Sequence, residues 1–218
     1  FGIKADTGRP ILAERFTASG GRIEHGEVAG FVRGEGIREV VLRDGRRLAA
    51  DEVVVCAGAH SAGLAKMLGE PIPLETERGY HTQIMAPGIT LKHSLIWPAR
   101  AFMVTPTAGG IRIGGTVEMA GLDAPPDYRR SKITVKRAQV ALPALRCEEF
   151  TEWMGHRPAL PDTVPILSAS AKTKGVFYAT GHGHLGLTYA ATTALLMGDL
   201  ITGAKPPVDL HPYRINRF

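Results

Sequence analysis

The chain has 218 residues, of which 44% are hydrophobic, and its formal net charge is +5. A chain of this length can bury a core in one or two domains. The modest basic excess suits anionic ligands, but only 6% of residues are aromatic and they do not interleave with basic ones, which argues against a nucleic-acid partner. No run of 18 apolar residues is present, so the sequence predicts no membrane-spanning helix.

Two cysteines, Cys56 and Cys147, form no CxxC motif and no disulfide framework. This usage indicates a reducing compartment, so we expect a cytoplasmic protein. The chain opens at Phe1 without a recognisable signal peptide, and we expect it to be part of a longer protein.

The first third of the sequence alternates short β patterns with two helices. A helix is predicted over Pro10–Ser19 and a second over Ser61–Leu68, after the turn at Gly58. The compact apolar run Glu52–Ala57 is typical of a buried strand in a parallel sheet, which would make Cys56 a core thiol. Three further strands are expected before it, at Arg22–His25, Val28–Arg33 and Ile37–Arg43.

The middle third changes character after Pro73 and predicts an antiparallel sheet followed by a helix over Arg129–Leu145. The expected strands are Tyr80–Met85, Phe102–Thr105 and Ile111–Val117. The helix carries an apolar stripe at helical spacing, made of Val135, Ala138, Leu142 and Leu145. Its other face is basic, with Arg129, Lys132 and Lys136. Such a face is either simply solvated or a contact for a membrane or a partner.

The last third contains a glycine-rich motif between a strand and a helix. The strand Val176–Thr180 leads into Gly181–Gly186, which reads GxGxxG, and a helix then runs to about Ile201. Glycines let a backbone approach a ligand closely, and a helix N-terminus attracts negative charge. A dinucleotide fingerprint also needs a following strand and an acidic residue, yet Gly203 and two prolines stand there. A self-contained dinucleotide fold is therefore excluded, which leaves a ligand-facing loop or a plain glycine-rich connection.

Two other groups of residues could carry chemistry. His182 and His184 are spaced for chelation, but no second pair of ligands accompanies them, so we expect no metal site. Arg157 stands directly before a proline in the segment Gly155–Asp162. Its planar guanidinium suits a carboxylate, and on local sequence alone this is either a structural salt bridge or a substrate clamp.

Five segments in this order, with matching gaps, resemble the FAD-dependent D-amino-acid oxidase superfamily, and most closely its bacterial D-amino-acid dehydrogenase branch of the small-subunit type. The segments are ADEVVVCAGAHSAGLAKMLG, IPLETERGYHTQI, IRIGGTVEMAG, GHRPALPDTVPIL and VFYATGHGHLGLTYAATTALLMGDLITG. The sequence departs from the family pattern at Thr163 and Ser168, where glycines are usual. The similarity covers nearly the whole chain, but only the C-terminal portion of such an enzyme.

The resemblance implies an α/β (α+β) fold, in which part of an FAD-binding Rossmann-like domain joins a substrate domain built on an antiparallel sheet. Residues 1–75 would be the C-terminal part of the FAD-binding domain and 76–150 the substrate domain. Residues 151–218 would return to the FAD-binding domain. The family's N-terminal dinucleotide motif is missing, so we expect this chain alone to hold FAD poorly and to be inactive.

The resemblance also assigns site residues. Backbone at Val28 would meet the adenine of FAD, and Ala57 and Gly58 would pack along its nucleotide part. The flavin ring would face a loop and helix start made of Gly181, His182, Gly183, His184, Leu185, Gly186, Leu187 and Thr188. Arg157 would grip the substrate carboxylate, with Tyr80 and His182 bordering the pocket. His60, His81 and His156 are interpreted as turn or surface histidines.

The implied reaction is oxidative deamination of a D-amino acid by hydride transfer to the flavin, with no catalytic base required. Two alternatives stay open. One is an oxidase or dehydrogenase of the glycine, sarcosine or hydroxyproline type. The other is a non-catalytic fragment or subunit that needs a partner to bind FAD. In the dehydrogenase branch the electron acceptor would be a quinone or the respiratory chain, with peripheral contact at the inner membrane.

Overall fold

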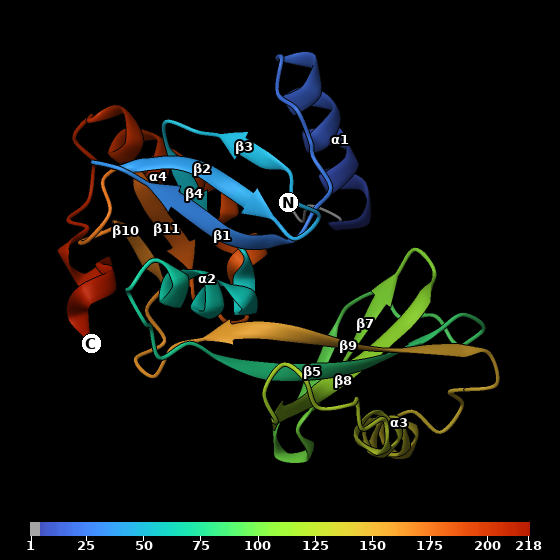
Figure 1. Ribbon diagram of the computed structural model, residues 1–218. Coiled ribbons are helices and arrows are strands. Elements are labelled where there is room, and N and C mark those ends of the chain that lie inside the picture. Colours follow the sequence, from blue (N-terminus) through green and yellow to red (C-terminus); the bar gives the residue numbers. More distant parts are fainter. Residues whose placement is uncertain (1–4) are drawn as a thin grey trace.

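The computed structural model describes residues 5–218 and shows two bodies, one with two three-stranded sheets and the other with a five-stranded sheet (Figure 1). The α-helices are α1 (Ala5–Ala18), α2 (Ser61–Met67), α3 (Arg129–Ala141) and α4 (Gly186–Thr202), with short 3-10 helices η1 (Gly58–His60), η2 (Pro98–Arg100), η3 (His211–Tyr213) and η4 (Ile215–Arg217). The strands are β1 (Val28–Arg33), β2 (Ile37–Leu42), β3 (Arg47–Ala49), β4 (Val53–Val55), β5 (Glu75–Ile84), β6 (Leu95–Trp97), β7 (Phe102–Thr107), β8 (Gly110–Met119), β9 (Phe150–Ala159), β10 (Ile166–Ala169) and β11 (Val176–Thr180).

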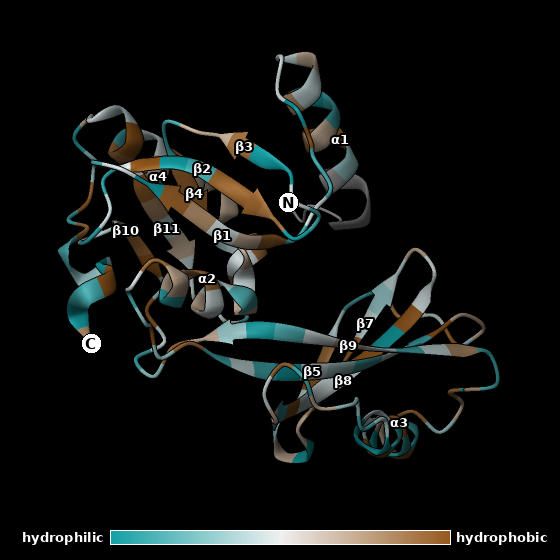
Figure 2. Cartoon of the chain, in the orientation of Figure 1, coloured by the Kyte–Doolittle hydropathy of each residue, from teal (hydrophilic) through white to brown (hydrophobic). Residues whose placement is uncertain are grey.

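The first body is an α/β layer centred on the sheet β10-β11-β4. β11 runs parallel to β4, with Tyr178 opposite Val55, and antiparallel to β10. Side chains of β11 alternate between two cores: Tyr178 packs with Val55 and residues of α2, whereas Phe177 packs with Leu196 of α4. In Figure 2 the hydrophobic colour marks β4 and α4, and also the neighbouring strand β2. The expected parallel strand at residues 52–57 is thus confirmed, with shorter bounds.

Two expectations for this body were wrong. Cys56 is exposed rather than buried, because β4 stands at the edge of the sheet and Val54 beside it is 38% exposed. The segment Arg22–His25 is irregular and exposed, since no strand of the described chain pairs with it. The other two early strands, β1 and β2, form an antiparallel sheet with β3 that lies beside the α/β layer (Figure 1).

The second body is an antiparallel sheet of order β6-β7-β8-β5-β9. One face packs against α3, whose stripe meets the strands in a core of Ile84, Phe102, Val104, Ile111, Ile113, Ala138 and Leu145. α3 ends at Ala141 rather than Leu145, because Pro143 follows two residues later. Leu145 still joins the core from the loop beyond.

Strand β9 was not anticipated from the sequence. It contains Pro158, which lacks an amide donor, yet β9 is an edge strand and tolerates such a residue. It pairs with β5 along its whole length, from Glu75 opposite Ala159 to Ile84 opposite Phe150. Residues 151–159 therefore lie in the five-stranded sheet, beyond the boundary expected at residue 150.

Candidate functional site

The face of the five-stranded sheet that points away from α3 carries a cluster of polar and aromatic side chains. On β5, Arg78, Tyr80 and Thr82 are buried on the α3 side, so Glu77, Gly79 and His81 point to the opposite face. The register of β9 places Trp153, Gly155 and Arg157 on that same face, directly opposite His81, Gly79 and Glu77. Two distant segments thus supply one surface.

The guanidinium of Arg157 lies flat over Gly79, where a Cβ would overlap it. Burial lowers the pKa of Arg157 and the neighbouring Glu77 carboxylate opposes that shift, so the group stays protonated at neutral pH. Its Nη1 is buried and has no hydrogen-bond partner among the described residues. A buried unpaired donor on a cation is costly, which suits a site completed by an anionic ligand.

The glycine-rich loop after β11 is fastened to the end of this face. Gly183 N donates a hydrogen bond to Pro158 O over 2.8 Å, and His184 Nε2 lies 2.8 Å from Glu77 Oε2. These contacts set residues 181–184 beside the strand positions that carry Arg157 and Glu77. The structure therefore brings the expected flavin-facing loop and the expected carboxylate clamp together.

His182 turns its ring toward α4. Its Nε2 lies 3.0 Å from Thr193 Oγ1, and burial lowers the pKa of the imidazole. The His182 side chain thus contacts α4, so only the His182 backbone lies at the surface of the loop.

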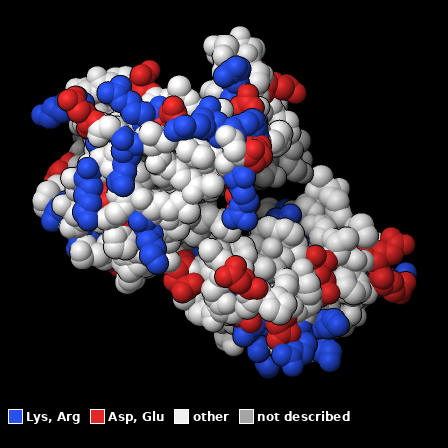
Figure 3. All heavy atoms as spheres, in the orientation of Figure 1, with Lys and Arg blue, Asp and Glu red and all other residues white. Residues whose placement is uncertain are grey.

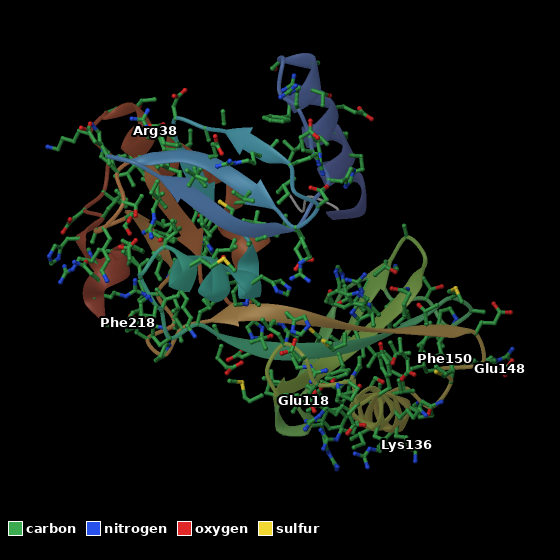
Figure 4. The ribbon with its side chains drawn as sticks, viewed as in Figure 1. Arg38, Glu118, Lys136, Glu148, Phe150 and Phe218 are labelled. Carbon is green, nitrogen blue, oxygen red and sulfur yellow. The ribbon has the colours of Figure 1, made fainter. Side chains whose placement is uncertain are left out.

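Tyr80 lies on the other side of the sheet from Arg157. It is only 2% exposed, its hydroxyl donates to the Glu118 carboxylate, and it accepts a 3.0 Å hydrogen bond from Asp127 N. Arg78, also buried, donates to Ala124 O over 2.7 Å. In Figure 4, Glu118 lies on the α3 side of the sheet. This network ties β5 and β8 to the loop that leads into α3.

The carboxyl ends of β4 and β11 meet at one edge of the α/β sheet. Thr180 Oγ1 donates to Gly58 O over 3.1 Å, which joins the two strand ends. Gly58 and Gly183 have φ values of 55° and 53°, and a Cβ on either would project into open space. Val28 lies in a different sheet, opposite Leu42 at the start of β1.

Residues 5–218 contain no group of three or more His, Cys, Asp or Glu side chains arranged to hold a metal ion. His184 is paired with Glu77, and His182 with Thr193. The candidate site consists of Arg157, the aromatic pair Trp153 and His81, and the glycine-rich loop at residues 181–186.

A family model described as FAD dependent oxidoreductase, DAO, matches residues 10–200. The chain belongs to this family. Among curated relatives, the D-amino-acid oxidase of Bradyrhizobium diazoefficiens is 36% identical over 95% of this chain and 50% of its own length. D-amino acid dehydrogenase 3 of Mesorhizobium japonicum is 34% identical over 73% of this chain and 40% of its own. The chain thus spans about half the length of these relatives.

The fold has solved counterparts. The crystal structure of glycine oxidase from Geobacillus kaustophilus superposes with a TM-score of 0.82, covering 96% of this chain and 57% of that one, at 22% identity. A partial FAD-dependent oxidase fold with an antiparallel sheet is therefore confirmed, as is the resemblance to D-amino-acid oxidases and dehydrogenases.

FAD is the cofactor of the family, and the residues present here fit part of it. Helix α4 begins without a side-chain cap at Leu185, so its first amide groups are free for an anionic or carbonyl partner. Leu185, Leu187 and Tyr189 are each 45–54% exposed, which gives this helix start an open apolar face. Together with the open space at Gly58 and Gly183, this surface suits contact between the protein backbone and the ring of a flavin.

The residues that sequence reasoning missed are those that depend on strand register. The sequence alone predicts a turn or surface histidine at His81 and gives no signal for Trp153, Gly79 or Glu77. The pairing of β5 with β9 brings them together with Arg157. The only local signal of the strand was the alternation along β9, which Pro158 obscured.

Proposed function

We propose that this chain forms the substrate face and the flavin-ring side of an FAD-dependent enzyme that oxidises D-amino acids. In this proposal the five-stranded sheet binds substrate, and the α/β body carries the flavin contacts at Val28, Ala57, Gly58 and residues 181–188. The observation that carries it is the unpaired buried Nη1 of Arg157, on an open face beside the glycine-rich loop. The relatives named D-amino-acid oxidase and D-amino acid dehydrogenase support the substrate class.

Arg157 binds the substrate carboxylate through two parallel N–H donors, which fixes both its position and its plane. The amide groups at the start of α4 and the backbone at His182 and Gly183 hold the ring side of the cofactor. When bound, FAD supplies the hydride acceptor. The reactive substrate would be a neutral amine, and its oxidised product would be released, after hydrolysis by water, as a keto acid and ammonia. The chain's contribution is orientation and charge.

Anaerobic mixing of the FAD-loaded holoenzyme, with its complete cofactor site, and D-alanine tests this proposal through the bleaching of the flavin absorbance. D-alanine should bleach the flavin and L-alanine should not. Arg157→Ala should raise the D-alanine concentration needed by about tenfold or more, because a charge-assisted bidentate contact is lost. Arg157→Lys should recover part of it. An unchanged concentration dependence in Arg157→Ala would overturn the clamp.

A second candidate substrate class is glycine, sarcosine or another secondary amine. The structural similarity to a glycine oxidase favours it at the level of fold. The same experiment separates the two classes: sarcosine bleaching the flavin faster than D-alanine and D-proline would favour the second.

A third possibility is a chain that holds FAD only with a partner. β4 lies at a sheet edge with Val54 and Cys56 exposed, and Leu195 of α4 is 73% exposed. These uncovered apolar groups support a further layer in the assembled protein. The purified chain should then copurify with substoichiometric flavin, and a stoichiometric yellow sample would contradict this.

We further propose a quinone as electron acceptor and peripheral contact with an anionic membrane surface. The outer face of α3 is basic, and Figures 3 and 4 show its cationic side chains, among them Lys136, at the end of the molecule below the sheet. A hollow of about 150 Å³ beside it is lined by Trp97, Arg100, Lys136, Arg137 and Val140. Such a mixture of basic and interfacial apolar groups suits a headgroup layer.

Cosedimentation with anionic and neutral vesicles tests the membrane contact. Binding should require anionic lipid, weaken with salt, and decrease in Lys132→Glu/Lys136→Glu. Equal binding to neutral vesicles would contradict it. No helix within residues 5–218 has the length and hydropathy needed to cross a bilayer.

A further inference from the structure

Two paired glycines leave a patch without side chains on the exposed face of the sheet, called here the glycine floor. Gly79 of β5 and Gly155 of β9 are direct register partners. Arg157 covers Gly79, and the indole of Trp153 covers Gly155, each at a place where a Cβ would overlap it. The Cβ positions of paired residues lie about 4.5–5.5 Å apart. The guanidinium and the indole are therefore neighbours on one floor.

Trp153 is unusually open for so large an apolar group, at 57% exposed. Its ring centroid lies 5.1 Å from that of His81, which comes from the neighbouring strand. The same row across the sheet continues through Gly114 to Met103, which is 42% exposed. The indole and the imidazole thus lie side by side, and the exposed thioether of Met103 lies in the same row, two strands beyond His81.

The charges around this surface set its preference. Burial, with the nearby Arg112 and Arg157, lowers the pKa of His81, so the imidazole is neutral at neutral pH. The cations Arg112 and Arg157 would repel a cationic ligand group placed beside the ring pair. The surface beside Trp153 and His81 therefore favours a neutral, apolar ligand group.

We propose that Trp153, with His81 and Met103, is the side-chain subsite for the amino acid whose carboxylate Arg157 holds. This rests on the proposed function. A substrate anchored on Arg157 lies within reach of the indole, so an aromatic or aliphatic side chain gains contact area that glycine cannot. Trp153 is therefore a specificity-determining residue that favours apolar over absent or cationic side chains.

Carboxylate binding tests this inference without turnover. Dissociation constants for acetate and benzoate are measured by calorimetry on the FAD-loaded holoenzyme. Trp153→Ala should weaken benzoate about tenfold and leave acetate within about twofold, because only the aromatic ligand contacts the indole. Trp153→Phe should retain most of the benzoate affinity. Trp97→Ala removes the other tryptophan, which lies on the α3 side of the sheet, and should change neither constant.

Gly155→Ala provides a second route that keeps Trp153. The added methyl displaces the indole from its floor, so the preference for benzoate over acetate should fall as in Trp153→Ala. The ratio of kcat/KM for D-phenylalanine over glycine should fall in both variants. If Trp153→Ala and Gly155→Ala weaken the binding of benzoate and acetate equally, or change neither, the proposed side-chain subsite is wrong, but carboxylate binding by Arg157 is not contradicted. If neither constant changes in Arg157→Ala, the proposed function itself fails.

Discussion

His184 Nε2 lies 2.8 Å from Glu77 Oε2, and this pair joins the loop after β11 to the strand that faces Arg157. The two side chains are 54% and 31% exposed, so their pairing contributes little to stability. Its consequence is positional, since the glycine-rich loop and the substrate face meet at this contact. The same carboxylate also faces the guanidinium of Arg157.

Glu77→Gln should therefore affect ligand binding, through the position of the loop, but not the stability of the fold. The free energy of unfolding should change by less than about 1 kcal/mol, as for other exposed pairs. The dissociation constant of FAD or the KM for D-alanine should rise several-fold, because the contact that fastens the loop to β5 is weakened. Denaturant titration and flavin fluorescence measure the two effects. A loss of stability without any change in binding would contradict the positional role.

Gly79→Ala should disable the carboxylate clamp without touching Arg157. The new methyl overlaps the guanidinium, which must leave its place over the strand. KM for a D-amino acid should rise about tenfold or more. Gly109→Ala is the matched control, because its Cβ would meet nothing within 4 Å and it lies in the turn between β7 and β8 of the same sheet, away from Gly79. Equal KM values for the two variants would show that Arg157 does not depend on this floor.

Tyr80 and Glu118 make the structure sensitive to acid. The Tyr80 hydroxyl, followed by Arg130 and Arg78, lowers the pKa of Glu118 below its ordinary value of 4.5. A depressed carboxyl pKa contributes stability above the unfolded pKa and loses it as pH falls through the folded one. Tyr80→Phe should cost about 1–3 kcal/mol at pH 7, because the buried carboxylate loses a donor.

Urea titrations of the native chain and Tyr80→Phe at pH 7 and pH 3.5 check this. The difference between the two proteins should shrink at the lower pH, because stability that comes from a lowered carboxyl pKa is lost as pH falls below the ordinary value of 4.5. A difference that stays constant with pH would mean that Tyr80 acts through packing alone.

The sequence predicted most of the helices and strands and the family. It did not predict which side chains share the candidate substrate face of the five-stranded sheet. Arg157 was recognised because its proline neighbour and its chemistry are local. Which face it shares was decided by long-range pairing, since Gly79 meets Gly155 only after 75 intervening residues fold back. Tyr80 and His81 differ by one position, and that single step places them on opposite faces. No local pattern carries this information.

Gly183→Ala tests whether the glycine-rich loop meets the cofactor. Gly183 has φ of 53° with open space around its Cβ position, so alanine costs mainly backbone strain, about 1 kcal/mol, in the protein without FAD. If the flavin lies against this backbone, the methyl should also weaken FAD binding by tenfold or more. Gly20→Ala is the matched control, with φ of 89° and equally open surroundings, far along the chain from the loop. It should show a similar loss of stability and an unchanged FAD dissociation constant. Similar FAD affinities in the two variants would place the flavin elsewhere.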